Sequence, residues 1–207
     1  MQARFITLEG GEGVGKTTNL AFIERYLQNH GVEVVRTREP GGTPLGENVR
    51  SLLLDSAHVD SRTELLLVFA ARAQHIAEVI RPALDAGHWV ISDRFTDASY
   101  AYQGGGRGIE TSVIGFLEHW VHQELQPDLT LLLDSPLDVG MARARGRGNV
   151  DRFESEQEAF FERVRQVYLD RAAAQPQRIK RVDASGSLED VQVELARHLD
   201  QLLESSR

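Results

Sequence analysis

The sequence predicts an α/β fold in which a five-stranded, mostly parallel sheet carries helices on both faces. Three observations support this. Short runs rich in Val, Ile and Leu alternate with longer helical patterns along the chain. A glycine-rich turn joins the first such run to the first helical pattern. The run Leu129–Asp134 is nearly all leucine, as expected for a strand that is buried on both faces.

The five strands are predicted from their β-branched, leucine and aromatic residues, each bounded by turn or helix signals. In chain order they are Arg4–Glu9, Val32–Arg36, Trp89–Ser92, Leu129–Asp134 and Ile179–Val182.

The helices are predicted from apolar residues at helical spacing and from their end signals. In chain order they are Lys16–His30 closed by Gly31, Leu45–Leu54, Thr63–Ala86 closed by Gly87, Thr111–Leu125, Leu137–Arg145, Glu156–Ala174 and a last helix after Ser187. Ser187 opens a Ser-Leu-Glu-Asp sequence that resembles a capping box. Pro82 should kink the third helix or mark its final turns. Gly104–Gly108 and Gly146–Asn149 are predicted to be flexible loops.

Composition narrows the function classes. The 207 residues are 41% hydrophobic and 26% charged, typical of one globular domain, and the net charge of -8 disfavours binding to long duplex DNA. The longest apolar run, Leu65–Ala71, is too short to span a bilayer, and no secretion signal opens the chain. The chain has no cysteine, which excludes disulfides and thiolate metal sites. We therefore expect a cytoplasmic protein.

The turn after the first strand matches G-x-x-x-x-G-K-[ST], a phosphate-binding loop, in the strand–loop–helix context that the motif requires. Its backbone N–H groups and the following helix N-terminus should hold the phosphates of a nucleoside triphosphate. Lys16 should reach the β- and γ-phosphates, and the Thr17 hydroxyl should ligate Mg²⁺. We expect Lys16 to be solvated in the empty protein. The ATP-binding residues are Gly10, Gly11, Glu12, Gly13, Val14, Gly15, Lys16, Thr17 and Thr18.

A phosphate loop alone does not define the activity. A GTPase would need Asn-Lys-x-Asp to read guanine, and the chain has only two lysines, Lys16 and Lys180, neither in such a tetrad. The length leaves little room for a helicase or transporter core. A small kinase remains the favoured class.

Four motifs resemble the bacterial thymidylate kinase family. The first is Leu8-Glu9-Gly10 leading into the phosphate loop with an acidic Glu12, and the second is Thr37-Arg38-Glu39-Pro40-Gly41-Gly42-Thr43. The third is Asp93-Arg94-Phe95 continuing through Ser99 to Tyr102-Gln103-Gly104-Gly105-Gly106-Arg107-Gly108, and the fourth is the arginine-rich segment from Arg143 to Arg147. The resemblance implies a P-loop nucleoside monophosphate kinase fold with a lid, in one domain that spans residues 1–207. It further implies transfer of a phosphoryl group from ATP, with Mg²⁺, to thymidine 5′-monophosphate in dTTP synthesis, and a homodimer.

The resemblance also assigns roles to charged residues near the sheet edge. Arg38 should bind the acceptor phosphate, and the Glu39–Pro40 bond is suggested to be cis, a geometry that few X–Pro bonds adopt. Arg94 should bind phosphate, and Asp93 should orient Mg²⁺ through water. Glu12 is also predicted to be a catalytic residue. Asp134 also ends an apolar strand and competes for the metal role by pattern alone, but a structural role is favoured for it.

The resemblance further implies that the acceptor base lies against the third helix and that the following residues bind it. Arg72 should hydrogen-bond a ring carbonyl and Phe69, on the same helix face, should stack on the pyrimidine. Relatives often carry the aromatic residue four positions before the arginine, which is Val68 here. Ser99 and Gln103 match positions that read the pyrimidine edge, and Tyr102 a ring against the deoxyribose. Arg50 either faces this pocket or is a solvated helix residue.

The segment of about 143–153 is predicted to be a lid that closes over ATP. An arginine delivered by a closing loop can stabilise the charge of the transferring phosphoryl group. Arg143, Arg145 and Arg147 are the candidates, and the sequence does not decide among them. Alternative functions are a kinase for another nucleoside or nucleotide, such as deoxyguanosine, and a nucleotide-dependent switch without turnover.

Overall fold

The computed structural model describes residues 2–145, 152–153 and 156–206. Five parallel strands form one sheet in the order β2-β3-β1-β4-β5. They are β1 (Phe5–Glu9), β2 (Val34–Arg38), β3 (Trp89–Asp93), β4 (Leu129–Asp134) and β5 (Ile179–Asp183). The predicted fold class is confirmed. Strand ends differ from the prediction by two residues or fewer at each end.

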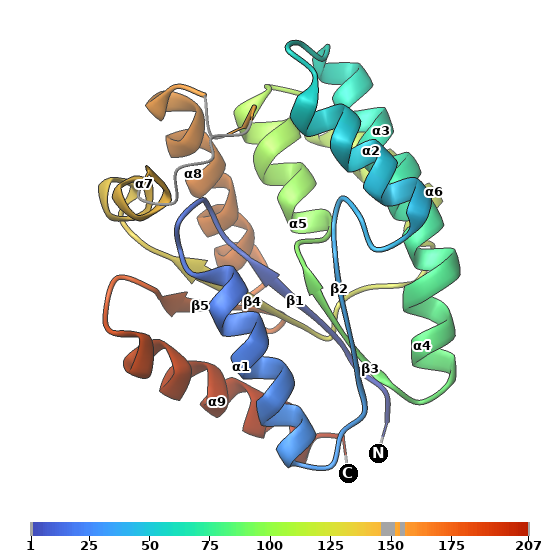
Figure 1. Ribbon diagram of the computed structural model, residues 1–207, viewed down its shortest axis with the longest axis vertical. Coiled ribbons are helices and arrows are strands. Elements are labelled where there is room, and N and C mark those ends of the chain that lie inside the picture. The colour runs from blue at the N-terminus through green and yellow to red at the C-terminus, as the bar shows by residue number, and fades with distance from the viewer. Residues whose placement is uncertain (1, 146–151, 154–155, 207) are drawn as a thin grey trace.

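The helices cover both faces of the sheet (Figure 1). In chain order they are α1 (Lys16–Asn29), α2 (Pro44–Asp55), α3 (Ser61–His75), η1 (Ile76–Ile80), α4 (Arg81–Asp85), α5 (Thr96–Ser99), η2 (Tyr100–Gly106), α6 (Thr111–His122), α7 (Leu137–Arg145), α8 (Glu158–Ala174) and α9 (Leu188–Glu204). The Ser187 hydroxyl accepts a hydrogen bond from the Asp190 N–H and so caps α9 as predicted.

Alternate strand residues bury themselves on opposite faces, the pattern that a two-sided sheet requires. Leu131 and Leu133 join α1 and α9 in one apolar cluster, while Leu132 joins α8 and η2 on the other face. Phe5 packs with the η1–α4 segment and Phe95. Both faces of β4 are therefore buried, as its leucine run predicts.

The long third helix is continuous but changes pitch. Its α-helical part ends at His75, a π-helical segment follows from Ile76 to Ile80, and Pro82 lies in the first turn of α4. Proline cannot donate a backbone hydrogen bond, so a widened turn just before it accommodates the break. The predicted distortion near Pro82 is confirmed.

The prediction of a flexible loop at Gly104–Gly108 is wrong for its first three residues. Gly104 to Gly106 complete the π-helical segment η2, which packs closely against α8. A Cβ atom on Gly106 would lie 2.4 Å from Phe160 Cε2, and one on Gly105 would lie 2.7 Å from Val167 Cγ2. These glycines permit close helix packing, which a sequence reading cannot distinguish from loop flexibility. The other predicted loop, Gly146–Asn149, lies outside the described residues.

Among the described residues, no helix combines the length and apolarity that a membrane span needs. The two ends of the described chain meet, because the Gln2 N–H donates to the Ser206 carbonyl.

Candidate active site

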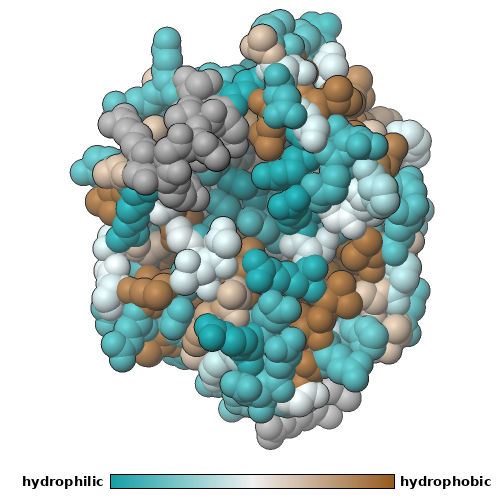
Figure 2. All heavy atoms as spheres, viewed as in Figure 1, coloured by the Kyte–Doolittle hydropathy of each residue, from teal (hydrophilic) through white to brown (hydrophobic). Residues whose placement is uncertain are grey.

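A cavity of about 540 Å³ opens at the carboxyl edge of the sheet. In Figure 2 the surface is hollowed in its upper half, with hydrophilic side chains around the opening. Most of the predicted site residues line this cavity. They are the loop residues from Glu12 to Thr18, then Arg50, Arg72, Asp93, Arg94, Ser99, Tyr102, Gln103 and Arg143. Its volume is in the range of sites that bind small ligands.

The phosphate loop forms one wall. Gly10 has a φ of 139°, and a Cβ atom there would lie 2.4 Å from the Leu133 carbonyl oxygen, so only glycine fits against β4. Gly15 precedes α1 with a φ of 88°. Thr17 and Thr18 are exposed to the cavity, while Gly10 and Gly11 lie behind it.

Lys16 is buried, which corrects the expectation that it is solvated. Its ammonium group donates to the Gly10 carbonyl at 3.1 Å and to the Gly11 carbonyl at 2.8 Å. Burial lowers the pKa of Lys16, and the nearby Arg94 charge lowers it further. The loop thus folds around its own lysine and holds it at the cavity wall.

Arg94 is held in a left-handed conformation, with a φ of 67°, directly after β3. Its Nη2 donates to Glu12 Oε1 at 2.6 Å and to the Tyr102 hydroxyl at 3.1 Å, and Tyr102 donates to the same Glu12 oxygen at 2.8 Å. Its buried Nε has no hydrogen-bond acceptor among the described residues. A buried donor of this kind beside the phosphate loop suits an anionic ligand.

Asp93 and Asp134 differ in the way that the sequence interpretation favours. The buried Asp93 Oδ1 has no hydrogen-bond partner among the described residues and lies at the cavity that Thr17 also lines. Asp134 lies outside this cavity, paired with Arg165 at 2.7 Å and Arg181 at 2.8 Å. Of the two, only Asp93 lines this cavity. The described residues hold no ready-made cluster of three acidic or histidine ligands.

Arg72 belongs to the opposite wall and is fixed by three groups. Its Nε donates to Glu39 Oε2 at 2.6 Å, its Nη1 to the Thr96 hydroxyl and its Nη2 to the Phe95 carbonyl. Burial tends to raise the pKa of the Glu39 carboxyl, but Arg72 and His75 outweigh it and lower that pKa. The guanidinium is 1% exposed and still borders the cavity.

The structure does not bring Phe69 to the cavity, contrary to the stacking prediction. Phe69 is buried in a cluster with Leu65 and Ile114, and its ring supports the Arg72 guanidinium at 4.7 Å. Val68 lines the cavity instead. One residue along a helix turns a side chain by about 100°, which places Phe69 in the core and Val68 at the wall.

Arg38 also lies away from the cavity wall. It is half exposed and pairs with Glu47 at 2.7 Å. Arg50 lines the cavity and donates to the Pro40 carbonyl at 3.3 Å, after a Glu39–Pro40 bond that is cis. Burial lowers the pKa of Arg50, as do the charges of Arg38 and Arg94. Arg50 and Arg94 therefore both contribute positive charge to the cavity lining.

The predicted lid is described only in part. The Arg143 guanidinium donates to the carbonyls of Ala184 and Ser185 and borders the cavity. The side chain of Arg145 and all of Arg147 lie outside the described residues.

Comparison with known proteins agrees with this geometry. Residues 8–195 match the family model described as thymidylate kinase. The chain is 57% identical to a thymidylate kinase of Pseudomonas putida, over the full length of both, and 59% identical to that of Chromohalobacter salexigens, over 98% of this chain and 97% of the relative. The chain belongs to the thymidylate kinase family. It is therefore an enzyme of the nucleoside monophosphate kinase class.

A solved thymidylate kinase from Ehrlichia chaffeensis has the same fold. It superposes with a TM-score of 0.80 at 36% identity and covers 97% of this chain and 99% of its own. The likeness extends over nearly the whole chain, so the family assignment covers both walls of the cavity.

The sequence does not single out Glu64 and Glu9, two buried acids near the site, as functional residues. Glu64 lies in the first turn of α3, where an acid ordinarily marks a helix N-terminus, so nothing in the sequence distinguishes it. Glu9 ends β1, and a charged residue closing an apolar strand before the phosphate loop is a signal that could have been used.

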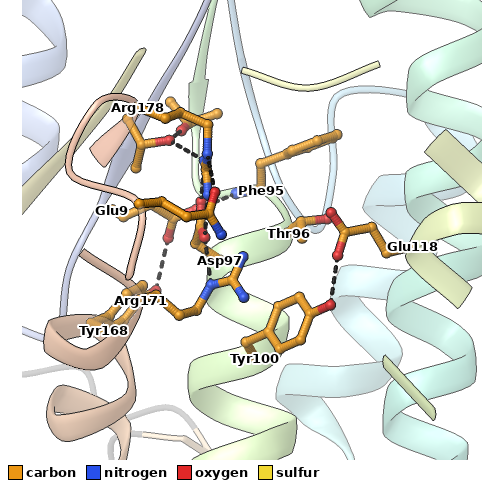
Figure 3. Close-up of polar contacts among 12 residues, drawn as sticks. Glu9, Phe95, Thr96, Asp97, Tyr100, Glu118, Tyr168, Arg171 and Arg178 are labelled. Carbon is orange, nitrogen blue, oxygen red and sulfur yellow. Dashed lines mark hydrogen bonds and ion pairs between the residues drawn. The ribbon is translucent and has the colours of Figure 1, made fainter. Parts of the chain in front are cut away.

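Glu9 supports the turn that carries Arg94. Its Oε1 accepts from the Phe95 N–H at 2.7 Å and its Oε2 from the Tyr168 hydroxyl at 2.8 Å (Figure 3). Burial raises the pKa of Glu9 to about 8, and the neighbouring Asp97 adds to this.

Asp97 is also buried, and two arginines pair with it. Arg171 and Arg178 pair with its carboxylate at 2.6 and 2.7 Å, which joins α8 and the start of β5 to α5 (Figure 3). Burial tends to raise the pKa of Asp97, but the hydrogen bond and charge of Arg178, with Arg171, lower it. The hydrogen bonds of Glu9 and the ion pairs of Asp97 therefore stabilise the segment after β3 that carries Arg94.

Proposed function

We propose that this enzyme transfers the γ-phosphoryl group of ATP to thymidine 5′-monophosphate, giving ADP and thymidine diphosphate in dTTP synthesis. One observation carries the proposal: a single cavity is lined by the phosphate loop and by the Arg72–Gln103 wall. The first wall fits a nucleoside triphosphate and the second fits a pyrimidine with a ring carbonyl. Membership of the thymidylate kinase family supports the choice of acceptor.

Catalysis would rest on positioning and on charge stabilisation. Lys16 would face the triphosphate, and Arg94 lines the same cavity with an Nε that has no acceptor in the described part of the chain. The acceptor is already an anion, so no strong general base is required. Glu12 aligns Arg94 through a 2.6 Å ion pair, and the Tyr102 hydroxyl supports both. The aromatic Tyr102 ring would lie against the deoxyribose.

Thr17 and Asp93 would hold the magnesium ion that this chemistry uses. Both line the same cavity, and the buried Asp93 Oδ1 has no hydrogen-bond partner among the described residues. Mg²⁺ supplies charge neutralisation at the phosphate oxygens when bound. The residues present fit a cation held through one carboxylate and one hydroxyl, the sparse set typical of magnesium–nucleotide sites.

The acceptor side would bind thymidine monophosphate through the wall residues named above. Arg72, Ser99 and Gln103 would read the base. Arg50 and Arg94 border the cavity, and Arg38 would join them at the phosphate by exchanging its exposed Glu47 partner. Phe69 would contribute through its support of Arg72.

The lid remains part of the proposal, in a single domain of residues 1–207 with a lid segment of about 143–153. Arg143 at the cavity edge supports it. Single alanine variants of Arg143, Arg145 and Arg147 test it: one of them should lower kcat by about two orders of magnitude with little effect on acceptor affinity. Near wild-type kcat in all three would refute the lid.

The enzyme would act as a homodimer in the cytoplasm. Exposed apolar residues share one face of α6 at helical spacing, namely Val113, Phe116 and Trp120, with exposed Leu66 on the contacting α3. A second copy of the chain would bury such a patch. The cysteine-free composition supports the proposed location in the reducing cytoplasm. Trp120→Glu should shift the mass measured by light scattering to that of a monomer.

A coupled ADP-release assay with and without thymidine monophosphate tests the function. We expect release that depends on thymidine monophosphate and exceeds release with deoxyguanosine monophosphate. A preference for another monophosphate would favour a different kinase. ATP binding without any acceptor-dependent turnover would favour a nucleotide-dependent switch.

A further inference from the structure

The buried carboxylate of Glu64 binds Gln103, which lines the acceptor wall together with Arg72 and Ser99. Glu64 is fully buried in α3. Its Oε1 accepts from Gln103 Nε2 at 2.9 Å, and its Oε2 accepts from Arg107 Nε at 3.2 Å and from Arg152 Nη2 at 2.7 Å. Three donors from two separate parts of the chain therefore converge on one acidic group.

This contact determines which way the Gln103 amide faces. A glutamine side chain ends in a carbonyl oxygen that accepts and an NH₂ group that donates, whereas an ion-paired carboxylate only accepts. Gln103 must therefore turn its NH₂ group toward Glu64. Its Oε1 takes no part in this contact, and Gln103 is one of the residues that line the cavity.

Arg72 and Ser99, the other polar residues of this wall, do not need a neighbour to fix the orientation of their hydrogen-bonding groups. Arg72 has only donors, so its rotation cannot change the kind of hydrogen bond it offers. The Ser99 hydroxyl rotates freely between donor and acceptor, and its buried Oγ has no hydrogen-bond partner among the described residues. Of Arg72, Ser99 and Gln103, only Gln103 changes from a hydrogen-bond acceptor to a donor toward the cavity when its side-chain amide flips.

We propose that Glu64 is a positioning residue for base specificity, which fixes Gln103 so that an acceptor oxygen faces the ring edge of the substrate. Thymine carries an N–H at N3 and would donate to this oxygen. Cytosine has an unprotonated N3, so two acceptors would face each other. The site thereby selects a 2,4-dioxopyrimidine monophosphate over a 4-aminopyrimidine monophosphate. This inference rests on the proposed function.

Glu64→Gln tests the inference. The new amide can donate to Gln103 Oε1, so Gln103 can turn its NH₂ group to the cavity and donate to N3 of cytosine. We expect the ratio of kcat/KM for thymidine monophosphate to that for deoxycytidine monophosphate to fall by about tenfold or more. An unchanged ratio in a folded Glu64→Gln enzyme would overturn the proposal.

Arg107→Met is the matched control. It removes an ion pair of Glu64 at 3.2 Å but leaves the Gln103 contact in place. We expect lower stability and a base ratio within about threefold of wild type. An equal fall of the ratio in both variants would assign Glu64 a structural role only.

The charge-balanced double variant Glu64→Gln, Arg107→Met serves if the single variant does not fold, and the same fall in the ratio is expected. The wild-type enzyme adds an arm that needs no variant. N3-Methylthymidine monophosphate, which keeps both ring carbonyls but lacks the N3–H, should bind at least about tenfold more weakly than thymidine monophosphate, and equal binding would overturn the acceptor role of Gln103. Failure of the proposed function is distinct, since wild-type enzyme would then not phosphorylate thymidine monophosphate at all.

Discussion

The two walls of the cavity are built in different ways. The phosphate loop is one stretch of nine residues, and its main contacts run between neighbours, such as Lys16 with the Gly10 and Gly11 carbonyls. The acceptor wall collects side chains from the β2–α2 connection, α3 and η2. Two buried carboxylates, Glu39 and Glu64, hold its readers Arg72 and Gln103 in place. The first wall is a local property of the chain and the second a property of the tertiary structure.

This difference separates activity from stability. Replacing a residue of the phosphate loop removes a contact with substrate and few contacts within the protein. Replacing a carboxylate behind the acceptor wall leaves a buried cation without its partner, which lowers the free energy of unfolding as well as substrate affinity. The predictions below test this separation.

Lys16→Ala should have the largest effect, because its ammonium group would contact the charge that develops on the transferring phosphate. We expect kcat to fall about 1000-fold, equivalent to about 4 kcal/mol, with the fold retained and the melting temperature lowered by a few degrees at most. Lys180→Ala is the matched control, because Lys180 is the only other lysine and bonds the Pro176 carbonyl at the surface. Turnover above about a tenth of wild type would refute the assignment of Lys16 to the γ-phosphate.

Glu39→Gln should lower the free energy of unfolding by about 3 kcal/mol, since the buried Arg72 loses its counter-charge. Urea unfolding measures this loss. The KM for the acceptor should rise, while the affinity for an ATP analogue should stay near wild type.

Glu47→Gln provides the comparison, because its ion pair with Arg38 is about half exposed. Its removal should cost about 1 kcal/mol or less. Similar losses in the two variants would contradict the distinction between a buried, tertiary wall and an exposed pair.

Gln103→Leu probes the acceptor wall at its cavity face. The variant replaces a polar edge that would pair with the base, so acceptor affinity should fall by about 2 kcal/mol, roughly 30-fold in KM. ATP affinity should change little, whereas the free energy of unfolding should fall by about 1–3 kcal/mol, because the buried Glu64 carboxylate loses one of its donors. If the KM for thymidine monophosphate is unaltered, the base is read elsewhere and the assignment of Gln103 is wrong.

The same contrast explains what the sequence could and could not predict. The phosphate loop, the order of the strands along the chain and the buried β4 follow from patterns within a few residues, and the structure has them. The sequence does not predict the burial of Lys16. The loop folds around the lysine side chain, and residue spacing alone does not indicate this contact. Phe69 and Val68 are adjacent and both apolar, so only the packing of α3 against α6 decides which one faces the cavity.

Long-range contacts account for the other omissions. Glu39 reaches Arg72 across 33 positions and Glu64 reaches Gln103 across 39. Each acid looks like an ordinary loop or helix-start residue until the chain is folded. The sequence predicts a flexible loop for the glycines of η2, because glycine occurs both in turns and where helices pack closely.

Acid should lower the stability of the protein through His122, which lies behind the acceptor wall. This ring is fully buried behind Arg72, stacked on Phe69 and 2.9 Å from the Thr96 hydroxyl. Burial, with the Arg72 charge, lowers the pKa of His122 to about 3. Between its unfolded pKa of about 6.5 and this value, the unfolded chain binds a proton that the folded protein does not, so stability falls as the pH is lowered.

We expect wild type to lose about 1–2 kcal/mol through this residue between about pH 7 and about pH 5, measured by urea unfolding. His122→Gln should be less stable at neutral pH but should show a correspondingly smaller loss on acidification. His58→Gln, at an exposed position on the α2–α3 connection, should keep the wild-type pH dependence. If His122→Gln and wild type lose equal stability over this range, His122 does not resist protonation. The acid sensitivity would then have to arise from groups outside the buried shell of the acceptor wall.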